Sequence, residues 1–148
     1  MRVYVRAGNI DDKTWITDEI REMAAEQDYF SSLYSEEHSP KVVEQLLTIG
    51  VSLVAENADK KKLGFILGTI TPHLYNPDLK VLSHMQWWVH PDHRKGVVAH
   101  ILFTSFTNMG HEHADIITLS LRDDVPIKSE NLKRYGFERH DKCYFLFK

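Results

Sequence analysis

The residues best suited to chemistry lie in the segment 87–99, WWVHPDHRKGVVA. An apolar strand is expected to end here and a helix to begin near Val97, with Arg94, Lys95 and Gly96 at the junction. The N-terminus of a helix exposes about four unpaired N–H groups and carries a partial positive charge, so it can bind an anion. The junction therefore predicts a phosphate site; the alternative is an ordinary glycine-containing turn with two solvated basic side chains.

Three features of the junction support the phosphate interpretation. Gly96 lets the backbone come close to a ligand, and the two cationic side chains can add charge-assisted hydrogen bonds. The small Ala99 in the first turn leaves room over the amides. Neither G-x-x-x-x-G-K-S/T nor G-x-G-x-x-G occurs in the chain, so the common nucleotide-binding loops are excluded.

Two histidine clusters, HPDH (90–93) and HEH (111–113), raise the question of a metal. Neither has the i, i+4 spacing of ligands on a helix, and no pair of thiols supports a structural zinc site. We expect no metal site. A serine hydrolase is excluded as well, because no G-x-S-x-G motif is present.

Hydrophobic periodicity predicts the elements that must position the junction. Strands are expected at 3–5, 51–56, 63–71, 80–89, 114–121 and 143–147. Helices are expected up to Gln27, then at 40–49, 97–109 and 128–135, with loops at 29–39 and 72–78. Helices interspersed with strands of a mixed sheet indicate a layered α/β (α+β) domain spanning residues 1–148.

Composition limits the classes of function. The 148 residues are 43% hydrophobic and 26% charged, as in a globular protein, and no apolar run is long enough to cross a bilayer. A net charge of −3 gives no general attraction to nucleic acid. The lone Cys143 fits a reducing compartment, so we expect a cytoplasmic protein that binds neither nucleic acid nor membrane.

The run VHPDHRKGVVAHIL (89–102) resembles motif A of the GCN5-related N-acetyltransferase (GNAT) superfamily. In that motif a strand ending in V-x-P leads to a glutamine or arginine, then to spaced glycines, then to a helix. The order of elements is similar over nearly the whole chain, and Gly136-Phe137 resembles the G-F dipeptide before the family's last strand. The resemblance implies the GNAT fold, a mixed sheet of about six or seven strands with about four helices and splayed central strands.

The resemblance implies acetyl-CoA as the acyl donor. Its pyrophosphate would lie on the junction, and its pantetheine arm along the preceding strand; the implied binding residues are Trp88, Val89, Arg94, Lys95, Gly96, Val97, Val98 and Ala99. Two positions depart from the family pattern. Val97 stands in place of the middle glycine, and Leu132 stands where the family commonly has a tyrosine as general acid.

The strand VLSHMQWWV contains no carboxylate, so its candidate catalytic residues are His84 and Gln86. By the two-residue period they share one face of the strand. His84 could act as a base near neutral pH, and Gln86 could orient a water or the substrate. The alternative for His84 is a strand residue with a satisfied hydrogen bond.

Two functions follow from these observations. The first is an N-acetyltransferase that moves an acetyl group from acetyl-CoA to a primary amine of a small molecule or peptide by direct transfer. The second is a catalytically weak or inactive GNAT-like module that binds CoA or a protein partner, which Val97 and Leu132 favour. A homodimer is compatible with either.

Overall fold

The computed structural model of the chain describes residues 1–122, 125 and 127–148. Its strands form one sheet in the order β1-β2-β3-β4-β5. The bounds are Val3–Ala7 (β1), Val51–Asn57 (β2), Lys62–His73 (β3), Asn76–Val89 (β4) and Ile116–Thr118 (β5). Neighbours from β1 to β4 are antiparallel, and β5 runs parallel to β4. The mixed sheet expected from the sequence is confirmed.

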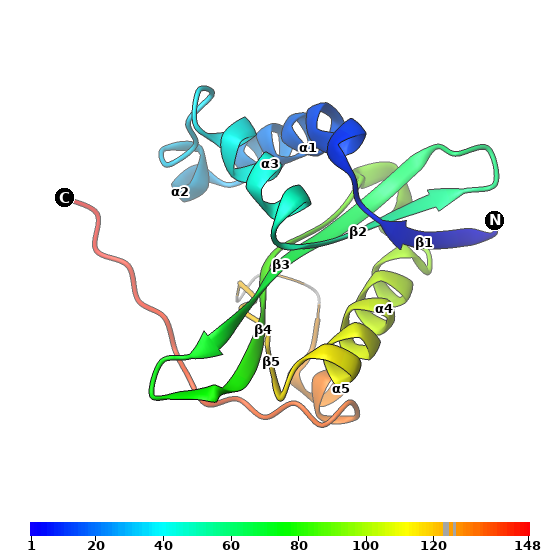
Figure 1. The fold of residues 1–148 in the computed structure, drawn as a ribbon. Helices are drawn as coiled ribbons and strands as arrows, with labels where there is room; N and C mark the ends of the chain where they lie inside the picture. Colours follow the sequence, from blue (N-terminus) through cyan, green and yellow to red (C-terminus); the bar gives the residue numbers. More distant parts are fainter. Residues whose placement is uncertain (123–124, 126) are drawn as a thin grey trace.

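Helices cover both faces of the sheet (Figure 1). On one face lie α1 (Lys13–Ala25), the short α2 (Asp28–Ser31) and α3 (Ser39–Thr48). On the other lies α4 (Val98–His113), which connects β4 to β5, and beside it the short α5 (Ser129–Lys133). Within the described ranges, no helix is both long enough and apolar enough to traverse a bilayer.

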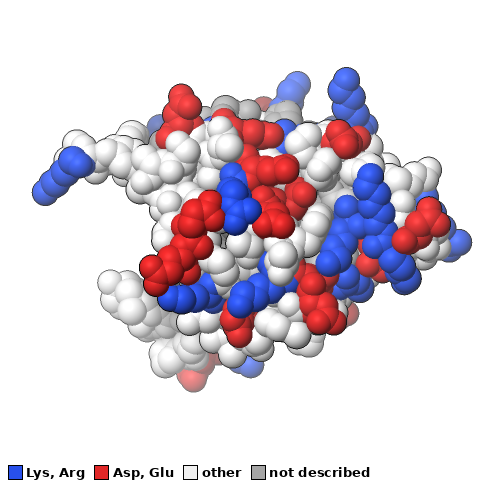
Figure 2. Space-filling model, turned by 90° about the horizontal axis from the view of Figure 1, so that it is seen from above, with Lys and Arg blue, Asp and Glu red and all other residues white. Residues whose placement is uncertain are grey.

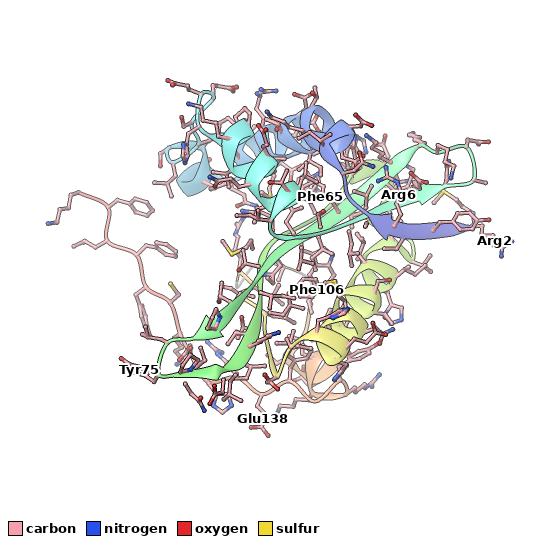
Figure 3. The ribbon with its side chains drawn as sticks, viewed as in Figure 1. Arg2, Arg6, Phe65, Tyr75, Phe106 and Glu138 are labelled. Atoms are coloured by element: carbon pink, nitrogen blue, oxygen red, sulfur yellow. The ribbon has the colours of Figure 1, made fainter. Side chains whose placement is uncertain are left out.

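The sheet separates two apolar clusters (Figure 3). Phe65 of β3 points toward α1 and α3, where it packs with Ile16 and Val43. Phe106 of α4 lies against the opposite face with Leu82 of β4. Alternate residues of a strand point to opposite faces, so β3 and β4 supply both clusters at once and form the centre of the fold.

Three sequence-based expectations were wrong in extent. The described part of the sheet has five strands rather than six or seven, because 143–147 is no strand and its side chains are exposed. The strand expected at 114–121 is ordered as β5 only over Ile116–Thr118. The loop expected at 72–78 is the end of a long hairpin, since β3 continues to His73 and β4 begins at Asn76.

A buried ion network joins β1 to β3 at the edge of the sheet away from β5. Asp12 is 1% exposed and accepts hydrogen bonds from Arg6 at 2.8 and 2.9 Å, and Lys62 lies 2.8 Å from it. Arg6 also donates to the buried Glu56 at 3.0 Å. Burial would raise the pKa of Asp12, but the hydrogen bonds from Arg6 and Lys62 lower it far below its usual range. Burial would likewise raise the pKa of Glu56, but the hydrogen bonds from Arg6 and Lys60 lower it.

The network makes the stability of the fold sensitive to acid. A carboxylate with a depressed pKa stabilises the folded state above its unfolded pKa of about 4 and loses that effect as the pH falls. Asp12→Asn should lower the free energy of unfolding by about 3 kcal/mol at pH 7, because it removes the buried carboxylate with which the partly buried Arg6 and Lys62 pair. The difference from the parent should shrink as the pH falls below about 4. Urea denaturation at several pH values measures both effects, with the exposed neighbour Asp11→Asn as the control.

Gly68 of β3 lies in a crowded part of the sheet. A Cβ there would lie 2.6 Å from the carbonyl oxygen of Ser83 and 3.0 Å from Phe106 Cε2. Gly68→Ala should therefore destabilise the protein by about 2 kcal/mol, since backbone and core must move apart. Thermal unfolding tests this, and an unchanged melting temperature would contradict the crowding.

Candidate functional site

The neighbouring strands β4 and β5 separate halfway along β4. β4 pairs with β5 only where Val81–Ser83 face Ile116–Thr118. It stays paired with β3 up to Val89. Residues 84–89 therefore have no strand partner on the β5 side among the described residues, and the splay implied by the family resemblance is confirmed.

The splay begins at a β-bulge. Leu67 pairs with Gln86 and Gly68 with His84, so Met85 is an extra residue in β4. A bulge bends its strand and increases the local twist, which turns the rest of β4 away from β5. It also shifts the two-residue period by one, and the expectation that His84 and Gln86 share a face was wrong. His84 lies on the α4 side with Gly68, and Gln86 on the α1 side with Leu67.

Beyond the bulge, alternate main-chain groups of β4 face the open side. The N–H of His90 donates to the carbonyl of Leu63 at 2.9 Å, which marks a hydrogen-bonded pair. Such pairs alternate along an antiparallel ladder, so Trp88 bonds to Phe65. The N–H and C=O groups of Trp87 and Val89 then point toward the opening. Of the strand residues implied to bind the pantetheine arm, Val89 keeps only its N–H unpaired there, because its C=O accepts the Nε–H of Arg94 at 3.0 Å; the polar groups of Trp88 bond to β3.

The two tryptophan side chains lie on opposite faces of the sheet. Trp88 is buried toward α1, where its Nε1–H donates to the buried carboxylate of Glu19 at 2.7 Å. Trp87 is turned toward α4 and stacks on Phe103 with ring centroids 5.7 Å apart. The Nε1 atom of Trp87 is buried and has no partner within the described residues. Trp88 is thus a core residue whose N–H has a partner, whereas the N–H of Trp87 lies beside the opening without one.

His84 lies where the strands part. Its Nδ1 accepts the N–H of Ser120 at 3.4 Å, across from β4 to the segment that follows β5. Its Nε2 is buried and has no partner in the described part of the chain. Burial lowers the pKa of His84 to about 4, so the imidazole is neutral at pH 7.

The junction between β4 and α4 carries the free amides that its sequence predicts. A 3-10 turn, Pro91–His93, follows β4, and the N–H of Gly96 bonds back to His93 at 3.4 Å. The first helical bond runs from Ile101 to Val97. No described residue accepts the N–H groups at positions 97–100. Val98 is fully buried, so the amides that an anion could reach are those of Val97, Ala99 and His100.

Arg94 and Lys95 differ sharply in their surroundings. Arg94 lies over the ring of Trp88 at 4.3 Å, donates from Nε to the carbonyl of Val89 at 3.0 Å, and pairs with Glu26 at 3.2 Å. The side chain of Lys95 is exposed, and no partner for it is found among the described residues. Arg94 therefore fixes the junction, and Lys95 is the cation left for a ligand.

A pocket of about 300 Å³ opens at the first turn of α4. It is lined by His100, Asn131, Arg134 and Tyr135. The hydroxyl of Tyr135 lies 3.4 Å from His100 Nδ1, so this tyrosine covers the start of α4. Leu132 of α5 is partly buried, and its side chain carries no proton to donate.

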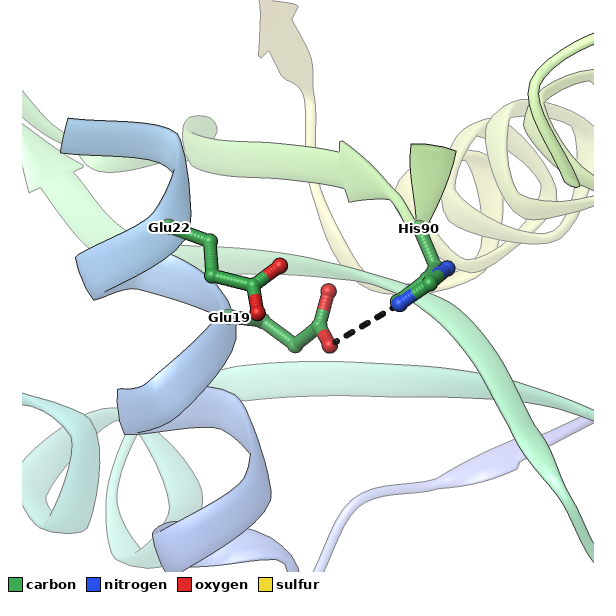
Figure 4. Close-up of side chains that lie close together, drawn as sticks. All are labelled: Glu19, Glu22 and His90. Carbon is green, nitrogen blue, oxygen red and sulfur yellow. Dashed lines mark ion pairs between the residues drawn. The ribbon is translucent and has the colours of Figure 1, made fainter. Parts of the chain in front are cut away.

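Sequence reasoning missed Glu19. It lies on the apolar face of α1 between Ile16 and Ile20, and an acidic residue at such a position is the signal that could have indicated it. With Glu22 and His90 it forms a cluster whose ligand atoms lie within 4.8 Å (Figure 4). His90 Nδ1 accepts the N–H of Asp92 at 3.3 Å, and its Nε2 faces Glu19 at 3.9 Å. The geometry suits a carboxylate–histidine pair better than a metal ligand.

Comparison with known proteins gives a match at the level of structure. No family model and no curated protein matches the sequence. A possible acetyltransferase from Clostridium difficile 630 matches with a TM-score of 0.77 at 16% identity, over 100% of this chain and 98% of that one.

Two other similar structures have named activities. The ribosomal-protein-alanine N-acetyltransferase of Brucella melitensis biovar Abortus 2308 matches with a TM-score of 0.69 at 17% identity, over 99% of both chains. AAC(6')-Iy, solved with the bisubstrate analog CoA-S-monomethyl-acetylneamine, matches with a TM-score of 0.73 at 17% identity, over 100% of this chain and 99% of that one. The chain has the GNAT-like α/β fold of these acetyltransferases.

Proposed function

We propose that the chain is a single-domain N-acetyltransferase that moves an acetyl group from acetyl-CoA to a primary amine. The observation that carries the proposal is the conjunction of two features. β4 parts from β5 after Ser83, and next to the end of β4 the amides at positions 97–100 are free. A ligand with a diphosphate at one end could bind the free amides, and an extended amide-containing arm at its other end could pair with the open edge of β4.

The residues present fit such a ligand. The free amides of Val97 and Ala99 would hold the diphosphate, with Lys95 adding charge and Gly96 allowing close approach, while the buried Val98 would anchor the first turn of α4. The N–H and C=O of Trp87 and the N–H of Val89 would pair with the arm as a strand would, while the C=O of Val89 stays bonded to Arg94. When bound, acetyl-CoA supplies an activated acyl group, so the protein needs no covalent nucleophile of its own.

The acceptor belongs on the side of the sheet covered by α1–α3. There acidic and basic side chains are interspersed, and several acidic groups lie together (Figure 2). Arg21 is held by Asp18 and Glu36, each at 2.8 Å, whereas Glu22 is exposed beside the buried Glu19. This surface favours a cationic amine. Gln86 faces the same side and would orient the amine or a water.

A CoA-binding module without efficient turnover is the second candidate, and Leu132 favours it. Because this residue cannot protonate a departing thiolate, the leaving group would have to take its proton from water. Binding of acetyl-CoA without release of thiol to any amine would establish the second candidate over the first.

Calorimetric titration tests the shared requirement. We expect the protein to bind acetyl-CoA with saturable heat, since the diphosphate meets free amides and an unpaired lysine. An absence of heat at millimolar ligand would overturn both candidates.

Gly96→Ala tests the position of the diphosphate. A Cβ at Gly96 would meet nothing closer than the carbonyl oxygen of His93 at 3.7 Å, so the fold should be unaffected. The added methyl group should nevertheless obstruct the ligand and weaken acetyl-CoA binding by about tenfold, roughly 1.4 kcal/mol. Calorimetry and a melting curve of the same sample measure both quantities. Unchanged affinity would place the diphosphate elsewhere.

Lys95→Gln should weaken acetyl-CoA binding several-fold and reduce its dependence on salt, because the variant loses a charge-assisted contact to phosphate. Lys61→Gln, which changes an exposed lysine of the β2–β3 hairpin, is the matched control.

A screen of thiol release with polyamines, aminoglycosides, amino acids and lysine peptides would then identify the acceptor class.

A further inference from the structure

His84 is a partly buried side chain with one buried nitrogen, Nε2, that the fold does not use. The Nε2 atom has no hydrogen-bond partner among the described residues, although it is shielded from solvent by the protein. A buried polar group without a partner costs about 1–3 kcal/mol, so one that is retained calls for an explanation. Packing alone gives none, because Phe106 and Gly68 beside it are apolar.

The partner of the other ring nitrogen decides where the proton lies. Nδ1 faces the main-chain N–H of Ser120, which can only donate, so Nδ1 must accept with its lone pair. A neutral imidazole has one proton, and it must then be on Nε2. The low pKa of His84 keeps the ring neutral at pH 7. The unused nitrogen is therefore an N–H donor and not a lone pair.

The position of this donor connects it to the open edge of β4. Ser83 and Thr118 form the last pair between the two strands, and His84 is the next residue. Its ring bridges to Ser120 and so lies at the apex where the strands diverge. From Val89 to His84 the strand runs about 17 Å at its usual rise, the scale of an extended arm that starts near the junction.

We propose that His84 donates a hydrogen bond from Nε2 to the carbonyl oxygen of the acyl thioester, and that it is not the general base. The inference rests on the proposed function and assigns a different role to one of its residues. Trp87, with a second buried and unpartnered N–H on the same face of β4, is available to a further carbonyl of the ligand.

In the reaction, the amine nitrogen forms a bond to the carbonyl carbon, and the carbon–sulfur bond breaks with its electron pair going to sulfur. Negative charge develops on the carbonyl oxygen during the attack, where the Nε2–H would stabilise it. The amine proton passes to water, and the thiolate takes a proton from water. His84 keeps its own proton throughout.

Comparison of acetyl-CoA with CoA tests the contact, because the free thiol lacks the carbonyl. In calorimetry His84→Ala should weaken binding of acetyl-CoA about tenfold and leave that of CoA within about twofold. His84→Gln, which keeps an N–H donor, should restore part of the difference. The exposed His111→Ala is the matched control and should change neither constant.

Nitrogen NMR of the histidine-labelled parent protein gives an independent measurement that needs no variant to fold. We expect the Nε2–H tautomer of His84 without ligand, and protection of its proton from exchange on addition of acetyl-CoA but not of CoA. Two results would overturn this inference and leave the proposed function standing. One is the Nδ1–H tautomer, and the other is an equal weakening of acetyl-CoA and CoA binding in His84→Ala. Failure of the parent to bind either ligand would overturn the proposed function and the inference with it.

Discussion

The strand β4 pairs with two neighbours over very different lengths. Toward β3 it is a continuous antiparallel strand up to Val89, and toward β5 it is a strand for three residues only. The extra residue Met85 reconciles these demands, because it bends the strand without ending its ladder with β3. The open edge, the placement of His84 at the apex and the separation of His84 from Gln86 all follow from this one insertion.

A second set of contacts holds the end of β4 against α1. Glu19 accepts the indole N–H of Trp88, the face of that indole supports Arg94, and Arg94 reaches back to the carbonyl of Val89 and to Glu26. The chain from helix to strand to junction consists of charge-assisted and aromatic contacts, which are directional. These contacts fix the direction in which α4 leaves the sheet, and so the direction in which its free amides point. Arg94 is thus part of the scaffold.

Most of the architecture could be predicted from the sequence, because the hydrophobic periodicity agrees with the positions of the prolines and glycines that begin or end the helices. Pro40 lies in the first turn of α3, Gly50 follows its end and Gly96 precedes α4, so these two helices and the junction were placed within a few residues. The short α2 was missed, because it lies where a loop was expected. The bulge could not be predicted, since one added residue in an apolar strand leaves no mark on composition. The same error put two candidate catalytic side chains on one face.

The ends of the fold illustrate a different limit. The apolar runs at 114–121 and 143–147 have the composition of strands, but a strand also needs a partner. β5 is paired for three residues, and Phe147 and its neighbours find no place in the described sheet. The role of Glu19 was hidden for a similar reason, because its partner Trp88 is 69 positions away in the sequence.

The opposite orientation of the two adjacent indoles gives the protein a built-in optical label. Trp88 lies between a carboxylate and a guanidinium beside the junction, whereas Trp87 is stacked on Phe103 across the sheet. The emission colour of an indole depends on the charges around it. Fluorescence from the first ring would therefore follow rearrangement of Arg94, and fluorescence from the second would follow events on the side of α4.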